Sequence, residues 1–254
     1  MRLASCAFSL IAFALVCIPL PQASAADPTP TRSAGEGVNR DALDLFDAIS
    51  AEKIDAKLIL KDETAGRLVV TNKTRQPLTI RLPEAFAGVP VLAQFNFPNN
   101  FPNNNNNSRN SNNSNQSVGG GTNGYGNNGG LMSIEPEKAV KIKVVAVCLE
   151  HGKREPNQYV AYEIEPLDQY TSDARLTEVV RALGRGDLDQ KSAQAAAWHL
   201  ANGLSWKQLA AKIGVRHIGG RTELFFTTAQ LQRAQAAISD ASRRAEQLTS
   251  AGQP

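Results

Sequence analysis

Alternation of apolar and polar residues predicts that the first half of the chain is built from β-strands. The strongest alternation places five apolar side chains on one face of a single strand: Val140, Ile142, Val144, Ala146 and Cys148. The opposite face carries two lysines and becomes apolar from Val145 onward, so this strand should start half-exposed and end buried on both faces. Shorter runs predict further strands at 56–61, 67–71, 77–82 and 160–164, which favours an antiparallel sandwich or a partial barrel.

A helical period replaces this alternation in the second half. The pattern and its capping residues predict four helices. The first begins at a cap at Thr171, Ser172 or Asp173 and stops at Gly184 and Gly186. The second runs from Gln190 to Asn202, the third from Trp206 to Ile213, and the fourth from the capping box of Thr227 to about Thr249. The last helix has a narrow, Ala-rich apolar seam. Such a seam favours docking on the body of the protein or a weak association with a partner helix over a stable coiled coil.

A low-complexity segment interrupts the strands. Residues 95–130 are rich in Asn, Ser and Gly and contain almost nothing apolar, so they are predicted to be disordered. Strands flank the segment on both sides, so it should decorate one β domain as a long tolerated loop. Asn-rich tracts can also associate through ladders of side-chain amides, which leaves weak self-association as the alternative.

The start of the chain predicts export. Arg2 precedes an apolar run from Phe8 to Leu20 that is too short for a membrane span, and small residues around Ala25 form a cleavage site. Residues 1–25 are therefore interpreted as a signal peptide and 26–38 as a flexible linker. We expect a secreted or periplasmic protein, and no later apolar run is long enough to predict a transmembrane span.

These elements together predict an α+β fold. It consists of an antiparallel β-sandwich-like domain at 39–166, a small helical subdomain at 167–218 and a long C-terminal helix with a tail at 219–254. The formal net charge is only +3, and removal of Arg2 with the signal lowers it further. A near-neutral, exported chain is not expected to bind nucleic acid, so the helix pair within 198–215 is interpreted as a plain αα-hairpin rather than a DNA-binding motif.

Four segments carry a resemblance to known proteins: 72–80, 82–94, the Cys-Leu-Glu-His-Gly-Lys motif at 148–153, and the Gln-Ala-Ala-Ala-Trp-His helix that begins at 194. They resemble a family of uncharacterised secreted bacterial proteins, in which a low-complexity insert follows the Val-Leu-Ala-Gln segment. The resemblance covers roughly residues 43–230. It implies secretion and a shared architecture, and it implies no activity.

Cys148 is the first candidate for chemistry. The two other cysteines lie in the predicted signal, so the exported chain would carry one unpaired thiol. Its position on an apolar strand favours a buried core cysteine. A thiol nucleophile is the alternative, with His151 or His199 as its base. A separation of three residues along a strand places Cys148 and His151 on opposite faces, which argues against a direct pair.

Gln194 offers a second kind of covalent chemistry. The segment from Ala193 to Trp198 resembles the Thr-Gln-x-Ala-x-Trp signature of bacterial thioester adhesin domains, which join a cysteine sulfur to a glutamine side chain. The threonine is replaced here by Ala193, and the aromatic neighbours of the cysteine are replaced by aliphatic ones. The favoured interpretation is an Ala-rich helix packed closely on the sheet, with Gln194 bonded to buried backbone.

No metal or cofactor is expected. Cys148, His151, His199 and His217 are too scattered along the chain to predict a zinc site. With no strong catalytic constellation, the sequence favours an exported, non-enzymatic interaction or structural module that meets an unknown protein or envelope partner. Covalent thiol chemistry at Cys148 is the alternative.

Overall fold

The structure is a computed structural model that describes residues 42–91, 115–122 and 130–251. The predicted signal peptide and linker lie outside the described residues, as does most of the Asn-rich segment. The described residues all belong to one compact unit, Asn39–Pro254.

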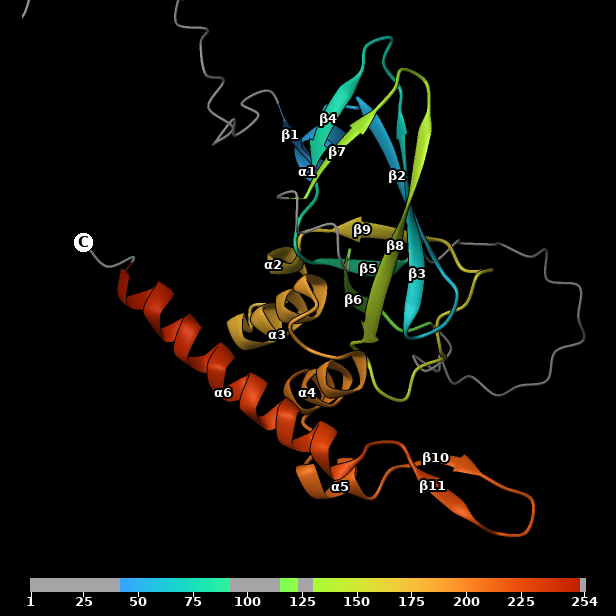
Figure 1. The fold of residues 1–254 in the computed structure, drawn as a ribbon, viewed down its shortest axis with the longest axis vertical. Helices are drawn as coiled ribbons and strands as arrows, with labels where there is room; N and C mark the ends of the chain where they lie inside the picture. Colours follow the sequence, from blue (N-terminus) through green and yellow to red (C-terminus); the bar gives the residue numbers. More distant parts are fainter. Residues whose placement is uncertain (1–41, 92–114, 123–129, 252–254) are drawn as a thin grey trace, which may run out of the picture. The chain divides into compact units, whose positions relative to one another are not determined.

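Six strands close into a barrel in which every neighbouring pair is antiparallel (Figure 1). Around the barrel they are β2 (Ile54–Leu60), β3 (Ala65–Asn72), β8 (Ala139–Cys148), β6 (Val118–Gly121), β5 (Phe86–Pro90) and β9 (Tyr162–Glu165). The predicted α+β class is confirmed, but the predicted sandwich is wrong. The sheet closes on itself where Leu58 of β2 pairs with Tyr162 of β9.

Strand β8 explains this closure. Its residues from Ala139 to Val145 pair with β3, and its last four residues, Val145 to Cys148, pair with β6 on the other side. The two neighbours of β8 thus pair with different lengths of it, and such a stagger between strands accompanies the closure of a sheet into a barrel. Ile142, Val144 and Ala146 of β8 belong to the cluster that fills the barrel.

A smaller sheet extends this core. It contains β1 (Leu43–Asp44), β4 (Leu78–Arg81) and β7 (Leu131–Ile134), and the short helix α1 (Leu45–Ser50) follows β1. Asp44 caps α1 by accepting a hydrogen bond from the backbone of Phe46. Leu45, Ile80 and Ile134 are fully buried in the same cluster as the barrel interior, so this sheet and the barrel share one core.

Strand β6 corrects the prediction that 95–130 is disordered. Val118–Gly121 lies inside that segment, yet all four residues are buried between β5 and β8. Three of the four are glycines, which contribute no apolar side chain to a sequence pattern. Their smallness lets a helix lie close, because a Cβ on Gly119 would meet the side chain of Val180 at 3.0 Å. The residues at 95–114 and 123–129 lie outside the described part.

The helices form two layers on one side of the barrel (Figure 1). After the single turn of α2 (Leu167–Tyr170), α3 (Ala174–Arg185) packs on β6 and α4 (Gln190–Asn202) packs on β8. The long α6 (Thr228–Ala251) lies across α3 and α4, as predicted for a docked helix. Asp173 and Asp189 cap α3 and α4, in agreement with the sequence. Among the described helices, none is long and apolar enough to cross a membrane.

Gly184 does not stop α3 as predicted. The helix continues through Arg185 and ends at Gly186, whose φ of 83° is left-handed. Gly184 instead marks the closest approach of α3 to the barrel. A Cβ there would lie 1.9 Å from the carbonyl oxygen of Glu84, so only glycine fits.

The helix predicted from Trp206 to Ile213 is shorter than expected. Helix α5 ends at Ala210, and the chain then forms a hairpin of β10 (Ile213–Arg216) and β11 (Thr222–Leu224). Gly219 and Gly220 adopt positive φ values of 102° and 85° at its turn, which explains why the chain reverses there. Both strands are exposed along their whole length, and the hairpin extends beyond the helices (Figure 1).

Candidate functional site

The candidate site lies where β8 ends against α4. Strand β3 begins at Ala65, so beyond it the outer edge of β8 has no neighbouring strand. At this edge the side-chain amide of Gln194 takes the place of a strand. Its Nε2 donates to the carbonyl oxygen of Cys148 at 2.8 Å, and its Oε1 accepts from the amide nitrogen of Cys148 at 2.9 Å. Both hydrogen bonds are buried, so Gln194 bonds buried backbone, as the favoured interpretation predicted.

Gln190 also binds the backbone of β8, one helical turn before Gln194. Its Nε2 donates to the carbonyl oxygen of Ala146 at 3.1 Å. Residues four apart share one helix face, and residues two apart on a strand point their backbone groups to the same side. The two glutamines of α4 therefore follow the free edge of β8 in register with it.

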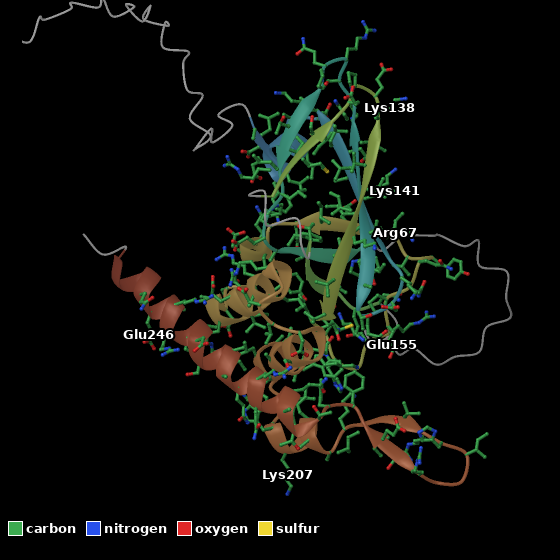
Figure 2. The ribbon with its side chains drawn as sticks, in the orientation of Figure 1. Arg67, Lys138, Lys141, Glu155, Lys207 and Glu246 are labelled. Carbon is green, nitrogen blue, oxygen red and sulfur yellow. The ribbon has the colours of Figure 1, made fainter. Side chains whose placement is uncertain are left out.

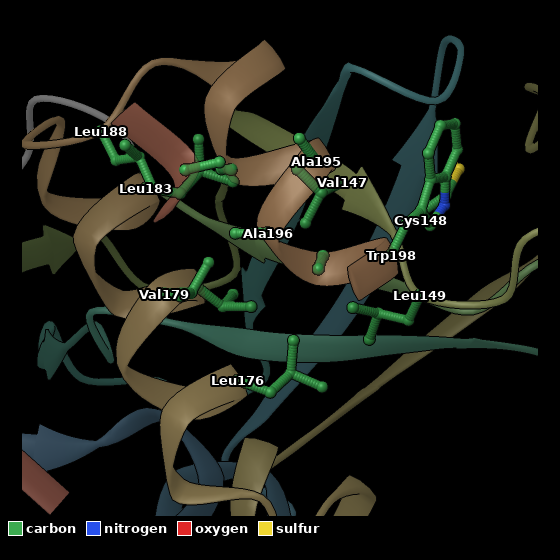
Figure 3. Close-up of a cluster of buried hydrophobic side chains, with 14 of the residues drawn as sticks. Val147, Cys148, Leu149, Leu176, Val179, Leu183, Leu188, Ala195, Ala196 and Trp198 are labelled. Atoms are coloured by element: carbon green, nitrogen blue, oxygen red, sulfur yellow. The ribbon is translucent and has the colours of Figure 1, made fainter. Parts of the chain in front are cut away.

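Small side chains bring α4 close enough for these bonds. Ala193, Ala195, Ala196 and Ala197 are all fully buried between the barrel and the other helices. Figure 3 shows this cluster, with Val147 and Leu149 of the β8 end facing α3 and α4. Cys148 belongs to this helix-facing cluster and not to the barrel interior that Ala146 joins. The face of β8 that was predicted to run to Cys148 therefore contributes to the barrel interior only as far as Ala146.

The Cys148 thiol is poorly suited to nucleophilic attack. The residue is 1% exposed, and it is free of any disulfide. Burial, together with the nearby carboxylates of Glu63 and Glu155, raises the pKa of the thiol to about 12. The reactive species in thiol chemistry is the thiolate, which this environment disfavours.

His151 lies near Cys148 but has other partners. Its backbone N–H donates to Oδ1 of Asn202 at 3.1 Å, and its ring Nε2 lies 3.0 Å from Nζ of Lys212. The ring meets Trp198 edge-on at 4.7 Å. Partial burial and the positive charge of Lys212 lower the pKa of His151 below its ordinary value of 6.5. The imidazole is therefore neutral at pH 7 and is held by α4 and Lys212.

The two remaining histidines stand elsewhere. Nδ1 of His199 donates to the carbonyl oxygen of Leu204, 2.7 Å away, and the ring stacks on Trp206 at 4.4 Å. It thus fixes the turn between α4 and α5. His217 pairs with Glu223 on the β10–β11 hairpin. Within the described ranges, no group of three or more His, Cys, Asp or Glu side chains is placed to hold a metal ion.

A cleft of about 310 Å³ opens beside Cys148. Its walls come from the end of β8 and the following turn, from α4, from the base of the hairpin and from two nearby loops. The lining side chains are Glu63, Gln116, Cys148, His151, Lys153, Glu155, Trp198, Lys212, Ile213 and Phe225. Sequence reasoning placed Cys148 and His151 here and missed Gln116 and Lys212. Gln116 lay in the segment predicted to be disordered, and Lys212 lay in a predicted helix.

Two buried polar atoms at this cleft have no hydrogen-bond partner. They are Oε1 of Gln116 and Nε1 of Trp198, on side chains that are only 4% and 6% exposed. One is an acceptor and the other a donor. Buried polar groups are nearly always paired, so these two atoms are exceptions. Both atoms are fully buried, so neither is open to the cleft that its residue lines.

Comparisons with protein-family models, with curated proteins and with solved structures give no match for this chain. The resemblance to the secreted bacterial family therefore stays a prediction.

Proposed function

We propose that the protein is an exported, non-enzymatic interaction module that acts by non-covalent binding at the cleft beside Cys148. The observation that carries the proposal is the state of the two groups that covalent chemistry would need. The Gln194 amide is engaged at both ends by the backbone of Cys148, and the Cys148 thiol is buried and protonated.

This arrangement disfavours a thioester between Cys148 and Gln194. A thioester would require the sulfur of Cys148 to attack the side-chain carbonyl carbon of Gln194 and expel ammonia. Here Nε2 of that amide is the donor that satisfies the carbonyl of Cys148, and its loss as ammonia would leave a buried carbonyl unpaired. The raised pKa of the thiol further disfavours the attack.

The thiol-enzyme alternative lacks a base. The His151 ring is held by Lys212 and Trp198, and the His199 ring is held by Leu204 and Trp206. Neither imidazole is bonded to the Cys148 thiol. General-base activation of a cysteine needs the base within hydrogen-bond reach of the sulfur.

Export is proposed from the sequence alone. Residues 1–25 have the features of a cleavable signal, and the protein or envelope partner would be met outside the cytoplasm. N-terminal sequencing of protein recovered from the periplasm or the medium should begin at Ala26. Recovery of the intact chain from the cytoplasm would contradict this part of the proposal.

Two measurements on the mature protein test non-covalent action. The intact mass should equal that of residues 26–254, and a thiol reagent at pH 8 should label Cys148 slowly in the native state and rapidly after unfolding. Cys148→Ser serves as the control for non-specific labelling. A mass lower by one ammonia would support the thioester instead, and rapid native labelling would support a thiol enzyme.

A further inference from the structure

The fold gathers positive charge on the outer face of β2, β3 and β8. Every second residue of a strand points to the same face of a sheet, and residues paired across two strands share that face. Five cations, four on these strands and one directly after β2, share the outer face in this way. We call them the cationic face: Lys57, Lys61, Arg67, Lys141 and Lys143. All five residues are exposed. Figure 2 shows Arg67 and Lys141 projecting from the same side of the barrel.

Arg67 lies at the centre of this face. On β8 it is directly opposite Lys143, and Lys141 is its diagonal neighbour. On β2 its diagonal neighbours are Lys57 and Lys61. Side chains directly opposite each other have Cβ atoms roughly 4.5–5.5 Å apart, and like charges in such a pair destabilise a sheet. Folding alone therefore does not favour this arrangement of charges.

Carboxylates do not neutralise the centre of the face. Lys57 pairs with Asp55 at 3.4 Å, and Lys61 pairs with Asp62 at 3.7 Å. Both lysines are more than two-thirds exposed, so these pairs are weak. Among the described residues, three cations of the face lie within ion-pair distance of no carboxylate: Arg67, Lys141 and Lys143.

A cleft of about 610 Å³ opens in the same face. Lys61, Arg67 and Lys143 line it together with apolar groups that include Ile59 and Val145, and none of its described lining residues is a carboxylate. Its volume is within the range of roughly 300–1,000 Å³ that is usual for ligand pockets. A hollow with cations and an apolar floor favours an anionic ligand that also brings uncharged surface.

The strands around the cleft restrict the kind of anionic partner. Strand β3 is paired with β2 on one side and with β8 on the other, so the centre of the face has no free edge to which an acidic peptide could add as a strand. Docking on a lipid surface uses apolar side chains that insert between the lipids. Among the outward residues of these three strands, Ile59 is the only large apolar side chain that is strongly exposed.

The surface next to the cations suits a sugar chain. A second cleft, of about 520 Å³, shares Ile59 and Gln158 with the first and contains Tyr159, which is 87% exposed. The tyrosine ring offers an apolar plane on which the apolar face of a sugar can pack, and the Gln158 amide can bond to hydroxyl groups. Asp55 and Glu163 line this second cleft, so the charged groups of a ligand belong over the first.

We propose that the cationic face binds a polysaccharide that carries carboxylate groups. The ligand carboxylates meet Arg67, Lys141 and Lys143, and neighbouring sugar rings lie toward Tyr159. The choice of a polysaccharide over a nucleic acid rests on the proposed export, because an exported protein is separated from the nucleic acids of the cell. The first cleft shares no lining residue with the cleft beside Cys148, so the cationic face is a second binding surface.

Titration calorimetry on the mature protein tests the inference with defined polymers. The probe is polygalacturonate, and uncharged dextran is the control. We expect polygalacturonate to bind and dextran not to bind. Binding should weaken about tenfold or more when salt is raised from about 50 mM to about 200 mM, because salt screens exposed charges. Poly-L-glutamate and vesicles of phosphatidylcholine with phosphatidylglycerol represent the peptide and lipid partners, and both should bind more weakly than polygalacturonate.

Charge reversal at one residue assigns the surface. Lys143→Glu places a carboxylate directly opposite Arg67, so it should weaken polygalacturonate binding about tenfold or more. The same change replaces a like-charge pair by an opposite-charge pair, so the melting temperature should stay equal or rise. Lys207→Glu is the matched control, because it changes the net charge equally at an exposed residue of α5, away from the barrel strands (Figure 2). The control should bind polygalacturonate as the unmodified protein does.

Three results overturn the inference: no binding of polygalacturonate at low salt, equal weakening by Lys143→Glu and Lys207→Glu, or tighter binding of poly-L-glutamate or of the vesicles. None of these results bears on the proposed function, which is tested by the intact mass and by the reactivity of Cys148. Rapid labelling of Cys148 in the native state would contradict that function and leave the assignment of the cationic face unchanged.

Discussion

Replacement of Gln194 by methionine isolates the hydrogen bonds that join α4 to the end of β8. Methionine has nearly the same length and keeps the apolar stem, so the packing among the buried alanines changes little. Both hydrogen bonds to the backbone of Cys148 are lost. The N–H and C=O of Cys148 are then buried without a partner, because the residue is 1% exposed and no strand lies at that edge.

The structure gives the magnitude of this loss. An unsatisfied buried donor or acceptor costs about 1–3 kcal/mol, so two such groups should lower the free energy of unfolding by roughly 2–6 kcal/mol. For a folded unit of this size, each kcal/mol corresponds to a shift of roughly 2–4 °C in the melting temperature. Gln194→Met should therefore melt at least about 4 °C below the unmodified protein.

Gln190→Met is the matched control, since it lies on the same face of the same helix. It loses one bond, to Ala146, and that bond is only partly buried, so water can replace it. The expected loss is about 0.5–1.5 kcal/mol. Urea unfolding followed by circular dichroism measures both variants. Equal effects at the two positions, or a Gln194→Met effect below about 0.5 kcal/mol, would refute the role assigned to Gln194.

Two further predictions concern α3. Gly184→Ala should lower the free energy of unfolding by about 4 kcal/mol or more, because the new Cβ would meet the carbonyl oxygen of Glu84. Gly203→Ala is the control: Gly203 has a φ of 67° and open space around it, so this variant should lose only about 1–2 kcal/mol. Similar losses in the two variants, measured by thermal melts, would contradict the close approach of α3 to the barrel. The side-chain hydrogen bond from Arg175 holds the pKa of Asp173 below its ordinary value of 3.8, so the ionised cap contributes stability above that value and loses it as pH falls through the lowered pKa. Asp173→Asn keeps the cap without the titration, so its deficit relative to the unmodified protein at pH 7 should vanish in acid; a deficit independent of pH would be the contrary result in urea unfolding.

Elements with strong local signals were predictable from the sequence. The bounds predicted for α4, Gln190 to Asn202, are those observed, because Asp189 caps one end and the left-handed Gly203 closes the other. The alternation over Val140 to Ala146 likewise identified the longest strand of the barrel. These signals act between residues close in sequence, so a pattern reveals them without knowledge of the fold.

The barrel itself was not predictable in this way. Its closure depends on the staggered pairing of β8 with β3 and β6 and on the pairing of β2 with β9, which are contacts between distant residues. Strand β6 gives no apolar signal because Gly119, Gly120 and Gly121 have no side chains, yet their smallness admits α3. Gln116 could not be assigned to the site because β6 was not predicted. Lys212 could not be assigned to it because the β10–β11 hairpin was not predicted.

The site nevertheless contains a signal that local patterns do carry. Gln190 and Gln194 are four residues apart on a helix whose other inward residues are mostly alanine, and the backbone groups they bind lie two residues apart at the end of β8. The rise of four residues along a helix, about 6 Å, nearly equals the rise of two residues along a strand, about 6.6 Å. A pair of amides at this spacing can therefore continue a sheet whose next strand is missing. This gives the Gln-Ala-Ala-Ala-Trp segment a structural reason to exist that requires no reaction at Cys148.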